Sequence, residues 1–177
     1  MVLANVAAAE TLIAKKSPLL FRVHEEPPVE KIDSLRETAE SAGFTLAKGQ
    51  VMQTRHLNAL LNAAAGTDHA ELINMSTLRS MTQAYYSPQN FSHFGRALKA
   101  YAHFTSPIRR YPDVMTHRLL FSYLHGGKSA SAEAYEKLCK HSSMMERKAS
   151  EAERESGKFF QVLYQRKQMN SPLKKQI

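Results

Sequence analysis

Proline and glycine divide the chain into stretches of helical length, and this division constrains the fold more than any other feature of the sequence. Breaks stand at Ser17-Pro18, Pro27-Pro28, Gly43, Gly66 and Gly126-Gly127. Proline lacks a backbone donor that a helix interior needs, and glycine readily adopts the conformation that ends a helix. Between the breaks, apolar residues recur at intervals of three and four, as on one face of a helix. The sequence therefore predicts a mostly helical fold with one or two short strands.

The expected elements follow from this division. Helices are predicted over residues 2–16, 28–43, 55–65, 68–81, 111–125 and 131–164. The alternating segment "LLFRVH" at 19–24 predicts a strand. Residues 83–95, "QAYYSPQNFSHFG", are rich in rings and turn formers and are predicted to be irregular. The polar, basic tail "QRKQMNSPLKKQI" at 165–177 is expected to fray or to link onward.

Three of these helices carry residues at helical spacing. Val29, Ile32, Leu35 and Ala39 share one face of the second helix. Leu72, Met75, Leu78 and Arg79 are spaced by three and four. Tyr135, Leu138, Cys139 and Met145 form a core-facing stripe on the last helix. Residues at this spacing lie on one side of a helix and favour packing. Cys139 is the only cysteine, so it is expected in the core rather than as a nucleophile, with no disulfide framework and no cysteine-based zinc site.

Composition sets bounds on the class of protein. The chain has 177 residues, of which 43% are hydrophobic, so a single globular domain is expected. Lys and Arg number 24 against 16 Asp and Glu, a formal charge of +8 that fits a polyanionic partner, with nucleic acid first, or equally a basic solvated surface. No apolar run approaches the ~20 residues of a membrane span. A cytoplasmic protein without a membrane partner is expected.

The segment "HFTSPIRRYPD" at residues 103–113 concentrates the chemistry of phosphate binding. Arg109 and Arg110 are adjacent, and guanidinium groups bind phosphate oxygens in a bidentate fork. Pro107 restricts the backbone before them, and the flanking rings could stack on bases. Asp113 could cap the next helix or orient an arginine. An arginine pair held in structural ion pairs is an equally good account of these residues alone.

The segment "HFGRALKAYAHFTSPIRRYPDVMTHRLL" at 93–120 closely resembles the signature of the ribonuclease II / ribonuclease R family. The similarity extends through "MVLANVAAAE", "LFRVHEEPPVEKIDSLR" and "LRSMTQAYYSP", and forward to "CKHSSMMERKASEAERESGKFF". These blocks stand in family order over residues 1–162. The resemblance implies the C-terminal part of an RNB domain, an α+β fold that is mostly helical here, with a basic tail or linker at 163–177.

The resemblance also implies roles for individual residues in 3′-to-5′ hydrolysis of single-stranded RNA. Arg109 matches a family arginine that contacts phosphates at the scissile 3′ end, and Glu153 matches a glutamate near the leaving nucleotide. These two are the expected catalytic residues. The expected RNA-binding residues are Tyr101, His103, Thr105, Ser106 and Arg110.

The family uses magnesium held by four closely spaced aspartates, and this chain has no such group. Its aspartates are Asp33, Asp68 and Asp113, far apart in sequence. A two-metal site needs carboxylates that clamp both ions. No metal ligand is therefore expected in this chain, which is expected to be inactive alone. Magnesium is expected on an Asp-bearing remainder of the RNB domain, in cis or as a separate chain.

Three origins stay open: a piece of a full ribonuclease, one chain of a split enzyme, or a relative that has lost catalysis. The corresponding functions are an exoribonuclease component and a non-catalytic RNA-binding or scaffold subunit. A third class, a helical protein unrelated to RNA, would give no more than weak charge attraction. If the chain is an exoribonuclease component, it is expected to expose an apolar face on which the missing half of the RNB domain packs.

Overall fold

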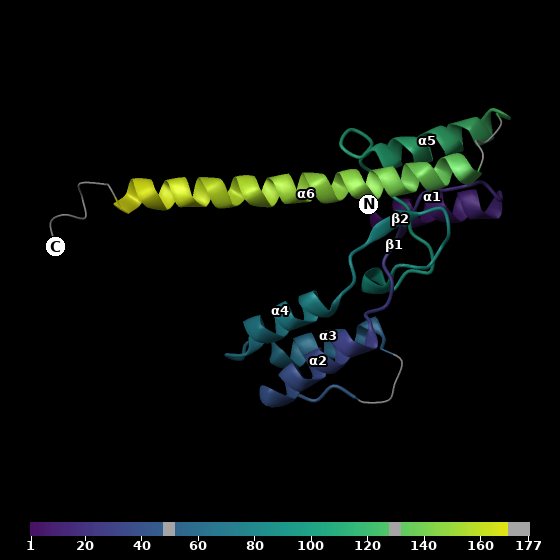
Figure 1. Ribbon diagram of the computed structural model, residues 1–177. Helices are drawn as coiled ribbons and strands as arrows, with labels where there is room; N and C mark the ends of the chain where they lie inside the picture. Colours follow the sequence, from purple (N-terminus) through teal and green to yellow (C-terminus); the bar gives the residue numbers. More distant parts are fainter. Residues whose placement is uncertain (48–51, 128–131, 170–177) are drawn as a thin grey trace.

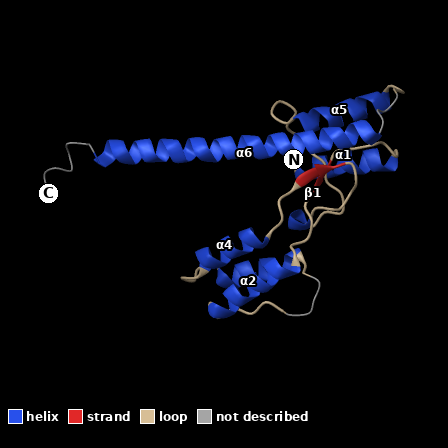
Figure 2. Cartoon of the chain, in the orientation of Figure 1, coloured by secondary structure: helices blue, strands red, loops and turns tan. Residues whose placement is uncertain are grey.

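The computed structural model describes residues 1–47, 52–127 and 132–169. Helices dominate, with one antiparallel sheet of two strands among the described residues (Figure 2). The elements are α1 (Val2–Ala14), β1 (Phe21–Val23), α2 (Val29–Ser41), α3 (Thr54–Ala64), α4 (Ala70–Ser80), β2 (Tyr85–Ser87), the 3-10 helix η1 (Phe94–Arg96), α5 (Tyr111–Leu124) and α6 (Ala132–Met169). The predicted α+β fold, mostly helical with short strands, is confirmed.

Two apolar cores give the molecule two parts, which Figure 1 shows joined by extended segments. The sheet lobe consists of α1, the two strands, α5 and the first half of α6, packed around Leu12, Leu20 and Cys139. The three-helix lobe consists of α2, α3 and α4, packed around Leu35 and Ile73. The chain crosses from one lobe to the other directly after β1 and returns directly before β2 (Figure 1).

The sheet positions the segment that precedes α5. Strand β1 pairs with β2 on one edge, with Arg22 opposite Tyr86. On its other edge, Phe21 forms a bridge with Ala102, and the Arg22 backbone N–H donates to the Tyr101 carbonyl oxygen at 2.8 Å. Residues 101–103 therefore enter the sheet lobe beside β1 and lead directly into residues 104–110, which include Arg109 and Arg110.

Helix α6 changes its environment along its length. Tyr135 and Cys139 are buried in the sheet lobe, whereas every residue from Arg147 to Met169 is exposed. Figure 1 shows this second half extending well beyond the rest of the molecule. The helix continues to Met169, so the chain does not fray between residue 165 and the end of the described residues. Residues 170–177 lie outside them, and the predicted boundary at 162–163 falls within the unbroken helix.

Several predictions about faces and strands need correction. Met145 and Val29 are 46% and 71% exposed, because each lies at the edge of its stripe, beyond the neighbouring elements. In α4 the stripe of Leu72, Met75 and Leu78 faces solvent, and Ile73 fills the core instead. The segment at 83–95, predicted to be irregular, contains β2 and the start of η1. Its three-residue strand exists because β1 supplies its hydrogen-bonding partner, a long-range effect without a local signal.

Within the described residues, no helix combines the length and the apolar character that crossing a bilayer requires.

Candidate nucleic-acid interface

The arginine-rich loop, defined here as residues 104–110, is a tight turn at the start of α5. The Ser106 carbonyl oxygen accepts hydrogen bonds from the backbone N–H groups of Arg109 and Arg110, at 3.3 and 3.2 Å. Arg110 is the N-cap residue of α5, and Pro112 stands in the first turn of that helix. The loop is thus closed by its own backbone and delivers the two arginines to the N-terminal end of a helix.

Asp113 fixes the conformation of this loop from the buried side. Its side chain is fully buried and accepts hydrogen bonds from the Ser106 backbone N–H and from an Arg110 terminal nitrogen, both at 2.8 Å. The second carboxylate oxygen lies 2.8 Å from Arg110 Nε. The prediction that Asp113 orients an arginine is confirmed, and that arginine is Arg110. A buried carboxylate is stable only with such partners, so this pair fixes the loop.

Arg109 and Arg110 consequently differ, although they are adjacent. The Arg110 guanidinium is mostly buried and bound to Asp113. Arg109 is exposed, next to the fully exposed Ile108, at the tip of the loop. The structure therefore presents Arg109 to solvent and uses Arg110 to support the turn beneath it. Whether Arg110 also contacts RNA stays a prediction.

Asn5 of α1 holds the other end of the loop. Its side-chain oxygen accepts hydrogen bonds from the backbone N–H groups of Phe104 and Thr105, both at 3.1 Å. Its amide nitrogen donates to the Tyr101 hydroxyl at 2.8 Å. Sequence reasoning missed this role of Asn5. The available signal was a polar residue within the apolar run "VLANVAAA", which a buried helix keeps only when the side chain has hydrogen-bond partners.

Tyr101 and His103 lie beneath the loop rather than on its surface. Both are buried, and their rings meet edge to face. His103 Nδ1 shares a hydrogen bond of 2.8 Å with the Tyr86 hydroxyl. Burial, followed by the charges of Arg110 and Arg22, lowers the pKa of His103 to about 3, so this histidine is neutral at physiological pH. Both residues support the loop geometrically, and their predicted contact with RNA stays a prediction.

Thr105 and Ser106 lie half-buried between these supports and the tip. Their backbone N–H groups bind Asn5 and Asp113. The Thr105 hydroxyl oxygen is buried and has no hydrogen-bond partner among the described residues. Beside them, the Phe104 ring stacks on the His117 ring at a centroid distance of 4.2 Å. His117 Nε2 also forms a hydrogen bond of 2.8 Å with the Phe104 carbonyl oxygen.

The sequence matches the family model described as "RNB domain" over residues 1–126. The chain belongs to the RNB-domain family. Ribonuclease R of Escherichia coli strain K12 is 42% identical over 167 residues, which cover 88% of this chain and 20% of that protein. The chain thus spans about a fifth of that relative. The predicted family resemblance is confirmed.

Solved structures of RNB relatives have the same fold. Ribonuclease R of Mycoplasma genitalium, determined in complex with ribose-methylated single-stranded RNA, has a TM-score of 0.85 at 30% identity, covering 95% of this chain and 28% of that one. Yeast Ssd1, described as a pseudonuclease, has a TM-score of 0.68 at 24% identity, covering 78% of this chain and 18% of that one. The second likeness concerns the fold alone.

Glu153, the second expected catalytic residue of this RNB chain, lies on the exposed half of α6. It lines a hollow of about 430 Å³ together with Gln83, Arg147 and Arg154. None of the residues of the arginine-rich loop lines this hollow. The structure therefore brings Tyr101, His103, Thr105, Ser106 and Arg110 together around one turn, with Arg109 at its tip, and leaves Glu153 on a separate element.

A second set of contacts that sequence reasoning missed connects α6 to the sheet. The Arg22 guanidinium binds both carboxylate oxygens of Glu146, at 2.5 and 2.9 Å, and lies 4.8 Å from the centre of the Tyr86 ring. Since the Tyr86 hydroxyl binds His103, these contacts run from α6 to the base of the loop. A mid-strand arginine in "LFRVH" was the only local signal.

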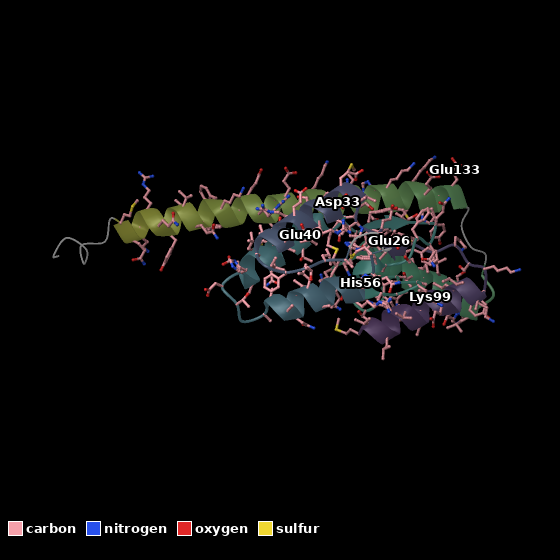
Figure 3. The ribbon with its side chains drawn as sticks, turned by 90° about the horizontal axis from the view of Figure 1, so that it is seen from below. Glu26, Asp33, Glu40, His56, Lys99 and Glu133 are labelled. Atoms are coloured by element: carbon pink, nitrogen blue, oxygen red, sulfur yellow. The ribbon has the colours of Figure 1, made fainter. Side chains whose placement is uncertain are left out.

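The aspartates of this RNB chain do not fit a magnesium site. Asp113 is occupied by Arg110 and Ser106, and Asp33 pairs with Arg36 on the three-helix lobe, where Figure 3 shows it near Glu40. Among the described residues, no group of three or more His, Cys, Asp or Glu side chains could hold a metal ion. Asp33 and Asp113 therefore lie on different lobes and are not grouped as a two-metal site requires.

Proposed function

We propose that this chain is part of a 3′-to-5′ hydrolytic exoribonuclease acting on single-stranded RNA. It supplies the phosphate-binding loop at Arg109 and part of the wall of the RNA channel. The magnesium-binding aspartates belong to an RNB segment outside this chain, in cis or on a separate chain, and this chain alone is inactive. Family membership and the RNA complex of the Mycoplasma genitalium relative support this proposal.

The observation that carries the proposal is the division of labour between two adjacent arginines. Arg110 and Asp113 close the loop internally, and Arg109 stays exposed above it. A guanidinium on a fixed turn meets a phosphate with little loss of conformational entropy. Placed at the scissile group, it stabilises the charge that develops on the phosphoryl oxygens in the transition state. Glu153 then acts near the leaving nucleotide, as the family resemblance implies.

The alternative is a non-catalytic RNA-binding or scaffold subunit. It is supported by Asp33 and Asp113, which are engaged in ion pairs with arginines. A fold does not by itself determine a function. Under this alternative Arg109 still holds phosphate, and RNA binding still weakens with salt as counterions are released, but no cleavage accompanies it.

A reconstitution assay separates the two. Single-stranded RNA labelled at its 5′ end is incubated with magnesium and this chain, alone or together with the Asp-bearing N-terminal half of a related RNB domain. We expect stepwise shortening in the combined reaction only. Arg109→Ala should slow it about a hundredfold or more, the usual cost of removing one transition-state donor. Arg55→Ala, which removes an exposed arginine of α3, should have little effect.

Two outcomes would redirect the proposal. Salt-dependent RNA binding without cleavage in any mixture, while a matched pair of halves from the relative does reconstitute, supports the scaffold alternative. Cleavage by the chain alone would place the metal ligands among its glutamates.

A further inference from the structure

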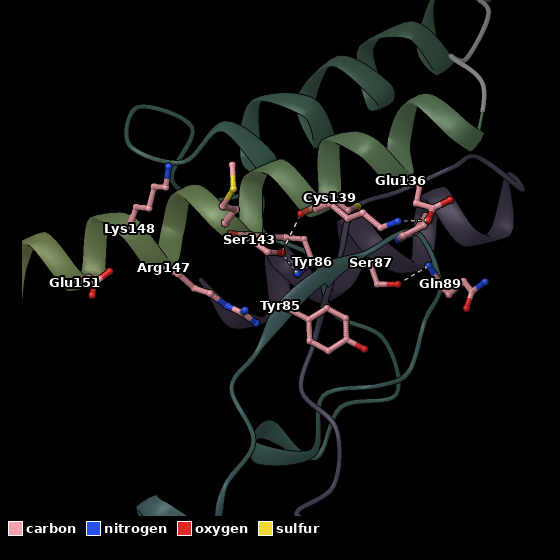
Figure 4. A pocket seen from close by; sticks show the side chains of 13 residues that line it. Tyr85, Tyr86, Ser87, Gln89, Glu136, Cys139, Ser143, Arg147, Lys148 and Glu151 are labelled. Carbon is pink, nitrogen blue, oxygen red and sulfur yellow. Dashed lines mark hydrogen bonds and ion pairs between the residues drawn. The ribbon is translucent and has the colours of Figure 1, made fainter.

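A pocket beside the hollow of Glu153, with which it shares Arg147 and Glu151, lies between β2 and α6. It has a volume of about 570 Å³ and lies under α6 in Figure 4. We call it the β2–α6 pocket and define it by Tyr85, Ser87, Gln89, Ser143, Arg147 and Glu151. The volume is within the range of small-molecule sites, about 300–1,000 Å³. None of the predicted site residues lines it.

The polar groups at the floor of the pocket form hydrogen bonds or ion pairs with one another. The Tyr86 backbone N–H donates to the Ser143 hydroxyl oxygen, and that hydroxyl donates to the Cys139 carbonyl oxygen, both at 2.9 Å. The Cys139 thiol is buried, and burial raises its pKa to about 12, so it stays protonated. Lys140 is neutralised by Glu136 at 2.7 Å. The floor is therefore preformed and carries little charge of its own.

The rim of the pocket carries the groups that are available to a ligand. Arg147 is exposed and forms no ion pair within the part of the chain that the structure describes. Figure 4 shows its guanidinium on the same side of α6 as the Tyr85 ring, with Ser87 and Gln89 farther along the pocket. The Ser87 hydroxyl oxygen accepts the Gln89 backbone N–H at 3.0 Å, which leaves its own hydrogen free to donate.

Tyr85 is held in place from outside the pocket. Its hydroxyl donates to a Glu25 carboxylate oxygen on the segment that follows β1. Burial, reinforced by Glu25, raises the pKa of Tyr85 to about 12, so the ring stays neutral and keeps this bond. The ring is only partly buried. A flat, fixed ring with an open side is a platform on which a nucleobase can stack.

From this arrangement we infer that the β2–α6 pocket binds a single nucleotide. Tyr85 stacks on the base, Arg147 binds the phosphate in a bidentate fork, and Ser87 donates to a polar edge. The nucleotide comes either from a free nucleoside monophosphate or from a strand of RNA, since both present a base and a phosphate. This site lies apart from the arginine-rich loop and does not depend on Arg109.

The negative charge of Glu151 allows a more specific test of nucleotide binding. It follows Arg147 by one helical turn and also lines the pocket, so its negative charge opposes a bound phosphate. Replacing it with neutral glutamine removes that repulsion. Glu151→Gln should therefore increase nucleotide affinity severalfold, an effect that a merely structural role of Glu151 would not produce.

Calorimetric titration of the full chain with AMP tests the inference. We expect saturable binding that weakens about tenfold in Arg147→Ala and in Tyr85→Ala, the usual scale of one phosphate fork or one base stack. Tyr85→Phe, which keeps the ring and loses only the bond to Glu25, should retain most of the affinity. Arg166→Ala is the matched control, because Arg166 is an exposed arginine of the same helix that does not line the pocket.

Further arms distinguish the sources of the nucleotide and the two sites. Binding of a short oligo(A) without binding of AMP assigns the pocket to RNA, and binding of both shows recognition of base and phosphate alone. Absence of both, or equal effects of Arg147→Ala and Arg166→Ala, overturns the inference. If Arg109→Ala rather than Arg147→Ala abolishes AMP binding, the ligand is at the loop. The proposed function then stands and the pocket inference fails.

Discussion

The two lobes contain aspartate–arginine pairs with the same spacing of three residues, in which the aspartates differ in burial. In the sheet lobe, Arg110 pairs with Asp113, whose side chain is fully buried. In the three-helix lobe, Arg36 pairs with Asp33, whose side chain is 55% exposed. The first pair also binds the Ser106 backbone and so fixes the arginine-rich loop. Spacing in the sequence thus sets which charges pair, whereas burial sets how much a pair contributes to stability.

The lobes differ in the same way as a whole. The sheet lobe buries polar side chains that have hydrogen-bond partners, among them Asn5, His103 and Asp113. The three-helix lobe is built mainly around an apolar cluster that includes Leu57 and Leu60. Buried polar contacts are directional and specify one geometry, while apolar packing tolerates substitution of similar volume. The lobe with the directional contacts is the one that carries the candidate interface.

The largest expected effect comes from Asp113→Ala. Removing it leaves the Arg110 charge and the Ser106 N–H without partners, so the free energy of unfolding should fall by about 3–5 kcal/mol. The same replacement at Asp33 should cost less, because its carboxylate is 55% exposed and Arg36 keeps its hydrogen bond to the Ala47 carbonyl oxygen. Urea denaturation of both variants measures the difference. Equal losses would contradict the comparison.

Leu60→Ala tests whether damage to the three-helix lobe stays local. Leu60 is buried in that core, and a cavity of this kind costs about 2–5 kcal/mol. We expect the RNA affinity of the folded variant to stay within about twofold of that of the unaltered chain, since the arginine-rich loop is fixed by the sheet lobe. Affinity measured by fluorescence anisotropy well below the melting temperature provides the check, with Asn5→Ala as the variant that should weaken binding.

The smallest expected effect is a dependence of stability on pH. Burial lowers the pKa of His103 to about 3 and that of His93 to about 4, from an ordinary value near 6.5. The unfolded chain therefore binds protons more readily than the folded chain below pH 6.5. The contribution of both histidines is complete above that pH and declines as the pH falls toward 4, by at most about 1.4 kcal/mol per pH unit for each.

Replacement of one histidine isolates this effect. Unfolding free energies measured between pH 7.5 and pH 5 should fall less steeply in His103→Gln than in the unaltered chain. An unchanged slope would show that His103 does not carry the predicted pH dependence.

Local pattern was sufficient for most helices and for the family. The spacing of apolar residues, together with the prolines and glycines that end each run, located α1 to α5 to within a few residues. This succeeds because the residues that specify a helix are only three or four positions apart. The blocks around "TSPIRRYPD" indicated the RNB family, which the comparison confirmed. They also placed the candidate residues Tyr101 to Arg110 in one segment, and the structure keeps them around one turn.

Tertiary structure decided what distant residues do to one another. Strand β2 forms because β1 lies beside it, more than sixty positions earlier in the chain. Asn5 supports a loop about a hundred residues away, and Arg22 reaches Glu146 across 124 positions. Arg109 and Arg110 are equivalent in sequence and differ only because a buried carboxylate reaches one of them. Such differences depend on burial and on partners that only the assembled fold brings together.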